Sequence, residues 1–230
     1  MKKIAVVIPA FNEGQSIGFV LDALPKTVAE VVVVDNNSND ETAQKAHIKG
    51  ATVLTEKRKG YGYACLKGMR YLEKNPPDIL VFLDGDFSDF PEDLTPLIQP
   101  IVENKVQFVL GSRVKSLRES GALTPQQIFG NALACRLMRI LYGSKFTDLG
   151  PFRAIDWSVL QGLNMQDKTY GWTIEMQLKI LKRKIPYCEI PVRYRKRIGI
   201  SKVSGTLNGT VMAGYKILTW IVTFYFSRWN

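Results

Sequence analysis

The first half of the chain alternates short apolar runs with amphipathic stretches, and this rhythm constrains the fold more than any other sequence feature. The short runs predict strands, and the stretches between them predict helices. We expect strands at 3–8, 30–34, 52–55, 79–83 and 107–110, with helices at 16–24, 40–49, 62–74 and 91–104. Strands that alternate with helices favour a mostly parallel sheet covered by helices on both faces.

Beyond Gly111 the expected helices become longer, at 126–142 and 172–184, and a strand is expected at 189–194. A chain of 230 residues is long enough for one large core, and neither an internal repeat nor a low-complexity linker interrupts it. We therefore expect one α/β domain over residues 1–205, a Rossmann-like three-layer sandwich. Ser38 followed by Glu41 predicts a capping box at the start of the second helix.

The C-terminal segment 206–230 is strongly apolar, apart from a narrow polar stripe of Lys216, Thr219, Thr223 and Ser227. Its apolar centre, residues 211–226, would be about 24 Å long as a helix, which is short of the roughly 30 Å needed to span a bilayer. We expect an amphipathic helix that lies on a membrane surface or docks to a partner. Packing against the core of the domain is an equally weighted alternative.

Composition excludes several classes of function. The three cysteines are far apart and odd in number, which argues against a disulfide framework or a zinc site. His47 is the single histidine, which argues against His-dependent catalytic triads and multi-His metal sites. The N-terminus lacks the features of a signal peptide, so a cytoplasmic protein is expected. Residues 179–202 hold nine of the 31 Lys and Arg against one acid, Glu189. This stretch favours an anionic partner such as phosphate, a lipid head group or nucleic acid.

Two carboxylates flank a glycine, as Asp84-Gly85-Asp86, where the apolar run 79–83 ends. Residues i and i+2 of an extended strand point the same way, so both carboxylates can face one hard cation. Such a cation takes oxygen ligands and keeps positions open for substrate phosphates. Asp and Gly are also common turn residues, so a simple polar turn is the alternative.

Three further loops, 9–14, 35–40 and 58–62, follow predicted strands, where open α/β sheets bind their ligands. With the Asp-Gly-Asp motif, their sequences resemble the GT-A fold of family 2 glycosyltransferases, and most of all its dolichyl-phosphate mannose and glucose synthases. The resemblance covers about residues 3 to 205. It rests on the segments 8–13, 34–40, 59–62, 84–86, 111–113, 147–153 and 198–202, together with Glu175.

The resemblance implies a role for each matched position. The nucleotide sugar and the acceptor would be held by Pro9, Ala10, Asn12, Glu13, Asp35, Lys59, Gly60, Asp84, Gly85, Asp86, Arg113, Arg153, Glu175, Arg195, Arg197, Ser201 and Lys202. Asp84 and Asp86 would also hold Mg²⁺ or Mn²⁺. The implied catalytic residues are Asp84, Asp86, Arg113 and Asp148, the last for positioning or for accepting a proton. Arg195, Arg197, Ser201 and Lys202 match the basic loop that closes over the phosphates.

Two positions depart from the mannose synthases. Ser88, followed by Asp89, stands where those enzymes carry a Gln, which leaves the third metal ligand open. Pro151 stands where related chains often carry a serine or another small residue, so their sugar specificity is a weak guide to the sugar that this chain uses.

The expected reaction is inverting transfer of a hexose from a nucleotide sugar to a polyprenyl or dolichyl phosphate, by an enzyme peripherally attached to the cytoplasmic face of a membrane. The donor expected is UDP-glucose or a similar UDP-sugar, with GDP-mannose as the other possibility. A phosphate acceptor is already largely anionic at neutral pH, so no strong base is required.

Four alternatives stay open. A nucleotidyltransferase would release pyrophosphate, and a glycosyltransferase could use a non-lipid acceptor. A dinucleotide oxidoreductase is only weakly indicated by Gly60-x-Gly62, because the third glycine is missing. The basic charge also meets one criterion for nucleic-acid binding, but no nucleic-acid-binding motif is present, so no nucleic-acid partner is expected.

Overall fold

The structure, a computed structural model, describes residues 2–199 and 207–227. Within these residues a seven-stranded sheet runs in the order β3-β2-β1-β4-β6-β5-β7. The strands are β1 (Ile4–Ala10), β2 (Glu30–Asp35), β3 (Thr52–Thr55), β4 (Ile79–Phe82), β5 (Phe108–Ser112), β6 (Arg153–Asp156) and β7 (Tyr187–Pro191). All neighbours pair in parallel except β6, which is antiparallel to both β4 and β5. The expected mostly parallel sheet is confirmed.

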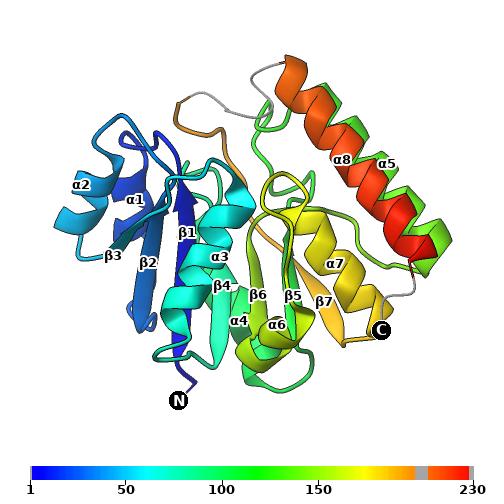
Figure 1. Cartoon of the computed structure of the whole chain (residues 1–230), viewed down its shortest axis with the longest axis horizontal. Coiled ribbons are helices and arrows are strands. Elements are labelled where there is room, and N and C mark those ends of the chain that lie inside the picture. Colours follow the sequence, from blue (N-terminus) through cyan, green and yellow to red (C-terminus); the bar gives the residue numbers. More distant parts are fainter. Residues whose placement is uncertain (1, 200–206, 228–230) are drawn as a thin grey trace.

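The helices form two layers on this sheet (Figure 1). One buried cluster joins the sheet to α1 (Ile17–Asp22), α2 (Thr42–Ile48) and α4 (Leu94–Val102), the last of which follows a short 3₁₀ turn, Pro91–Asp93. The other cluster joins the opposite face to α3 (Tyr61–Leu72), α5 (Pro125–Tyr142), α6 (Trp157–Leu163), α7 (Trp172–Lys182) and α8 (Leu207–Phe226). The expected three-layer α/β architecture is thereby confirmed.

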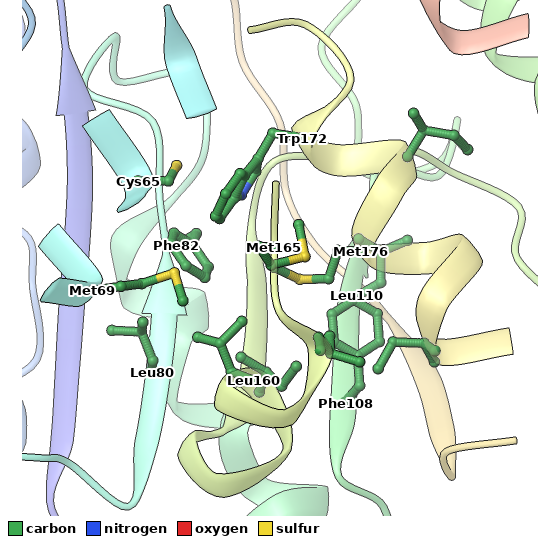
Figure 2. Close-up of a cluster of buried hydrophobic side chains, with 14 of the residues drawn as sticks. Cys65, Met69, Leu80, Phe82, Phe108, Leu110, Leu160, Met165, Trp172 and Met176 are labelled. Atoms are coloured by element: carbon green, nitrogen blue, oxygen red, sulfur yellow. The ribbon is translucent and has the colours of Figure 1, made fainter. Parts of the chain in front are cut away.

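The larger cluster fixes the middle of the sheet. Figure 2 shows Met69 of α3 beside Phe82 of β4, with Trp172 and Met176 of α7 on the other side. Phe82 and Trp172 meet edge to face, with ring centroids 5.8 Å apart. Aromatic pairs of this geometry add to the free energy gained from burial alone. Strand β4, which leads into Asp84, is therefore held firmly on this face.

Three local expectations differ from the structure. Strand β7 occupies Tyr187–Pro191 rather than 189–194, and the short β6 was not expected at all. The capping box expected at Ser38 and Glu41 is absent, because α2 begins at Thr42 with Glu41 as its N-cap residue. The Ser38 hydroxyl instead accepts a hydrogen bond from the Asn12 backbone N–H at 2.9 Å. A capping box does open α5, where Thr124 and Gln127 satisfy each other's backbone N–H groups.

Helix α8 packs along α5 and α7 (Figure 1). Ile221 and Phe224 are buried, the Tyr142 hydroxyl donates to the Ile221 carbonyl at 2.6 Å, and Lys182 donates to the Phe224 carbonyl at 3.0 Å. The inner side of α8 thus packs on the domain, which is one of the alternatives that the sequence left open for this segment. None of the described helices combines the length and the apolar character needed to cross a membrane.

Candidate active site

The carboxyl ends of β1, β2 and β4 meet at one edge of the sheet. In register, Ala10 pairs with Asp35, and Val7 pairs with Phe82. The loops that follow these strands therefore start side by side, as the sequence predicted. This edge carries the site.

The loop after β1 is tied to the loop after β2. Asn12 has a φ of 54°, a left-handed conformation that Asn tolerates better than most residues. Its side-chain oxygen accepts from the Asn39 N–H at 2.8 Å, and the Glu13 N–H donates to the Thr42 hydroxyl at 2.8 Å. Asn12 was expected to hold substrate, and its side-chain oxygen helps to shape the loop.

A second set of contacts gathers the groups expected around the nucleoside. Asp35 is buried at the end of β2, and the next residue, Asn36, accepts from the Gly60 N–H at 2.8 Å. The Lys59 ammonium lies 5.5 Å from the centre of the Phe11 ring. The structure thus brings an acidic group, a basic group and an aromatic face together beside β1 and β2.

The Asp-Gly-Asp carboxylates lie at the end of β4. Asp84 Oδ1 is buried and has no hydrogen-bond partner among the described residues. Burial raises the pKa of Asp84 to about 7, and the charge of Asp86 acts in the same direction. Asp86 accepts from the Ser88 N–H at 2.9 Å and from the Ser88 hydroxyl at 2.6 Å. Two neighbouring carboxylates, one of them buried with an unpartnered oxygen, form a site that a cation would stabilise.

A guanidinium group reaches this site from a distant part of the chain. Arg197 Nη1 lies 3.2 Å from Asp86 Oδ2, and Nη2 lies 3.0 Å from Glu13 Oε1. The backbone N–H of Ile198 donates to the Asp86 carbonyl, and that of Arg195 donates to the Ser88 carbonyl. The segment that ends at the basic loop is therefore anchored along residues 86–88.

Arg113 and Asp148 form a buried bidentate ion pair. The guanidinium donates to the carboxylate at 2.8 Å and 2.6 Å, and the Arg113 N–H donates at 2.8 Å. Burial acts to raise the pKa of Asp148, but the charge and hydrogen bonds of Arg113 outweigh it and hold the pKa below its usual value. Of the two roles expected for Asp148, the geometry fits positioning and does not fit accepting a proton.

Arg153 and Glu175, expected to shape a sugar and acceptor pocket, are fully buried in contacts with backbone. Arg153 donates to the carbonyls of Gly150 and Thr173. Glu175 accepts from the N–H groups of Gln166 and Asp167, both at 2.8 Å. In this structure both side chains hold loops in place instead of facing an open pocket. Ser201 and Lys202 lie outside the described residues.

Asp89, noted from the sequence only as the residue after Ser88, is buried near the site. Asp89 is 2% exposed, and neither carboxylate oxygen has a hydrogen-bond partner within residues 2–199 and 207–227. Burial raises its pKa well above the usual value, with Asp84 and Asp86 adding to the effect. Next to it the Arg195 guanidinium stacks between Phe87 and Phe90, at 3.7 and 3.6 Å from the ring centres. The sequence gives no local signal for this burial, because the segment that covers Asp89, around Tyr194, is more than 100 residues away.

The mostly parallel sheet, with paired carboxylates directly after β4 at the carboxyl ends of its strands, is the arrangement expected for the GT-A fold. The model of glycosyl transferase family 2 matches residues 5–163. The chain belongs to this family and is a glycosyltransferase, as expected from its motifs.

Named relatives extend the comparison. A UDP-N-acetylglucosamine–dolichyl-phosphate N-acetylglucosaminyltransferase of Methanococcus voltae is 28% identical, over 94% of this chain and 93% of its own length. An undecaprenyl-phosphate mannosyltransferase of Micrococcus luteus is also 28% identical, over 90% of both chains. The expected resemblance to polyprenyl-phosphate sugar transferases is confirmed.

A solved structure shares the fold. Glucosyl-3-phosphoglycerate synthase of Mycobacterium tuberculosis, in complex with Mn²⁺, UDP-glucose and phosphoglyceric acid, superposes with a TM-score of 0.77 at 22% identity. The match covers 97% of this chain and 80% of that one. At this level of identity the likeness supports the fold alone.

Proposed function

We propose that this glycosyltransferase moves a hexose from a nucleotide sugar to a polyprenyl phosphate, with inversion and with Mg²⁺ or Mn²⁺, at the cytoplasmic surface of a membrane. The observation that carries the proposal is the pairing of Asp86 and Glu13 with the Arg197 guanidinium, next to the buried carboxylate of Asp84. This arrangement places a compensated cluster of negative charge where β1 and β4 end.

The carboxylates fit a hard divalent cation. Asp84 offers an unpartnered buried oxygen, and Asp86 offers an oxygen that already contacts a cationic group. Among the described residues no group of three or more acidic, His or Cys side chains is placed to hold a metal. A cation held by the two aspartates would take its other ligands from donor phosphates and water, as Mg²⁺ usually does. It would stabilise the charge that develops on the departing diphosphate.

The nucleoside end of the donor would lie beside Phe11, Asp35 and Lys59. The Phe11 ring offers a stacking face, and the Asp35 carboxylate can accept from a ribose hydroxyl or a base N–H. We favour UDP-glucose or a similar UDP-sugar over GDP-mannose. The Methanococcus relative is named for a UDP-sugar donor and the Mycobacterium structure contains UDP-glucose, which supports this preference.

The acceptor phosphate would attack the anomeric carbon directly, and the nucleoside diphosphate would leave from the opposite face. The nucleophile is an oxygen that is already anionic near neutral pH, so the site needs cations more than a base. Arg113, held rigidly by Asp148, supplies one such cation. The names of the Methanococcus and Micrococcus relatives support a polyprenyl-type phosphate.

Membrane attachment would use one apolar face. On α5, Phe129 and Ile140 are exposed on the same side as Arg136, and on α8 Tyr215 and Phe226 are exposed at helical spacing. Helices α5 and α8 pack together, and we propose that these exposed residues act as one surface, which we term the α5–α8 face. Apolar side chains mixed with a basic one suit the surface of an anionic bilayer.

The function is tested by incubating the protein with UDP-glucose, Mn²⁺ and a short-chain polyprenyl phosphate, and by identifying the nucleotide product. We expect UDP in amounts equal to the glucosyl lipid. UDP without a glucosyl lipid would mean a different acceptor. No product from UDP-glucose, together with release of pyrophosphate from UTP and a sugar phosphate in a parallel incubation, would mean a nucleotidyltransferase.

A further inference from the structure

One buried carboxylate, Asp167, connects the C-terminal helix to the edge of the sheet that carries the site. We propose that Asp167 is a positioning residue for the donor site, through which helix α8 fixes the loop 164–171 against the start of α3. The proposal rests on the proposed function, because it takes the segment around Gly60 to border the donor.

The contacts of Asp167 come from both α8 and its own loop. One carboxylate oxygen accepts from the N–H groups of Thr169 at 2.7 Å and Gly171 at 3.0 Å. The other accepts from the Trp220 indole N–H at 2.9 Å and lies 2.9 Å from the Lys216 ammonium. Lys216 also donates to the Thr169 hydroxyl at 2.6 Å. Asp167 is 5% exposed, so these bonds are shielded from water and the carboxylate depends on all of them.

A second buried pair holds the same loop from α7. Glu175 accepts from the Gln166 and Asp167 N–H groups, and it forms an ion pair with Lys179 at 2.6 Å. The Lys179 ammonium in turn donates to the Asn164 carbonyl at 2.7 Å. The backbone of the loop is therefore fixed on the α7 side without help from α8. Removing the contacts from α8 should shift the loop without unfolding it.

The loop presses directly on the start of α3. The Lys168 carbonyl accepts from the Tyr63 N–H at 3.1 Å. A Cβ atom at Gly60 would lie 2.2 Å from the Lys168 carbonyl oxygen, and one at Gly62 would lie 2.1 Å from the Asp167 carbonyl oxygen. Only glycine permits so close an approach, which leaves the two segments no room to move independently.

From Gly60 the contacts continue to the nucleoside setting. The Gly60 N–H donates to the Asn36 side chain at 2.8 Å, and Asn36 directly follows Asp35. Asn36 also donates to the carbonyls of Glu56 and Arg58, which lie just before Lys59. A continuous series of contacts thus runs from Lys216 and Trp220 to the residues that would hold base and ribose. Helix α8, which also carries part of the α5–α8 face, would in this way influence donor binding.

The test uses the full chain with two substitutions that release Asp167 from α8, Lys216→Met and Trp220→Phe. The control is Lys182→Met, because Lys182 anchors the C-terminal end of α8 through the carbonyls of Phe224 and Ser227 and does not touch Asp167. Binding of UDP with Mn²⁺ is measured by calorimetry, and exchange of the Tyr63 amide by hydrogen–deuterium exchange without ligand.

We expect each test variant to weaken UDP binding about five-fold and to speed exchange at Tyr63, whereas the control changes neither. The KM for the donor should rise while the KM for the lipid acceptor stays unchanged, and Lys216→Arg should restore donor binding. A purely structural role of the α8 contacts would lower the thermal stability of all three variants equally. It would also change the KM for the donor and the KM for the acceptor by the same factor.

The proposal is overturned if Tyr63 exchange is unchanged in the test variants, or if Lys182→Met weakens UDP binding as much as they do. It is also overturned if exchange rises while UDP binding stays the same. If the wild-type protein binds no UDP, the uridine donor of the proposed function is wrong, and exchange at Tyr63 alone decides whether α8 positions the loop.

Discussion

Arg197 Nη1 lies 3.2 Å from Asp86 Oδ2, so a guanidinium group occupies the position beside the Asp-Gly-Asp carboxylates where a divalent cation would bind. The same guanidinium contacts Glu13 on the loop after β1. Arg197 thus joins the loop after β1 to the loop after β4. When a metal and a diphosphate enter, it would exchange its carboxylate partners for phosphate oxygens, which favour bidentate guanidinium contacts.

The first prediction concerns Arg197→Gln. Without nucleotide, this variant should bind Mn²⁺ about five-fold more tightly, because a competing cation has been removed from Asp86. With donor present its turnover should fall, because the guanidinium no longer reaches the diphosphate. Electron paramagnetic resonance of free Mn²⁺ measures the binding. Arg193→Gln is the matched control, since Arg193 pairs with Asp93 outside the site; equal or weaker Mn²⁺ binding by Arg197→Gln than by this control would contradict the prediction.

The second prediction concerns pH. The pKa of Asp84 is raised to about 7 in the folded protein, above about 3.9 for an unfolded Asp. Between these values the folded state binds more protons than the unfolded state, so the contribution of Asp84 to stability falls as pH rises from about 4 to 7. Asp84→Asn should remove this cost and melt at least about 3 °C above wild type at pH 8, but not at pH 4.

Thermal unfolding of both proteins at the two pH values, without metal, measures the difference. An equal gap between wild type and Asp84→Asn at pH 4 and pH 8 would mean that Asp84 titrates normally. Saturating Mn²⁺ should narrow the gap at pH 8, because a bound cation stabilises the charged carboxylate.

The third prediction concerns the α5–α8 face. Phe129 is 70% exposed on this face, and Ile48 of α2 is 72% exposed in the opposite helical layer. Phe129→Ser should lower binding to vesicles that contain anionic lipid about five-fold, while Ile48→Ser should not. Co-sedimentation with the vesicles measures binding. A similar loss in both variants would indicate that the face has no special role.

The sequence predicted the strands that end at the site, because β1, β2 and β4 are runs of apolar residues with polar loops directly after them. It also predicted which loops meet, since parallel strands bring their carboxyl ends to one edge. Strand β6 was missed because Arg153–Asp156 has a charged residue at each end and shows neither an apolar run nor an alternation of apolar and polar residues. Its pairing with β4 and β5 depends on segments that are distant in the sequence, so no local pattern indicates it.

Contacts between distant segments could not be predicted in the same way. The ion pair of Arg197 with Glu13 joins residues 184 positions apart, and the burial of Asp89 depends on the segment around Tyr194. Glu175 looked like a substrate residue because of its place in the motif order, yet its carboxylate holds the backbone of Gln166 and Asp167. A motif is a reliable guide to which residues are important, but it is a poorer guide to the atoms that those residues contact.

The most direct measurement follows labelled glucose from UDP-glucose into the organic phase with a short-chain polyprenyl phosphate and Mn²⁺, in wild type and Asp86→Asn. The substitution keeps an oxygen to accept from Ser88, so the fold and melting temperature should be retained. We expect label in the organic extract with wild type and a loss of about a hundred-fold or more in the variant. Transfer by Asp86→Asn at the wild-type rate, or no transfer by the wild type from any UDP- or GDP-sugar, would contradict the proposed function.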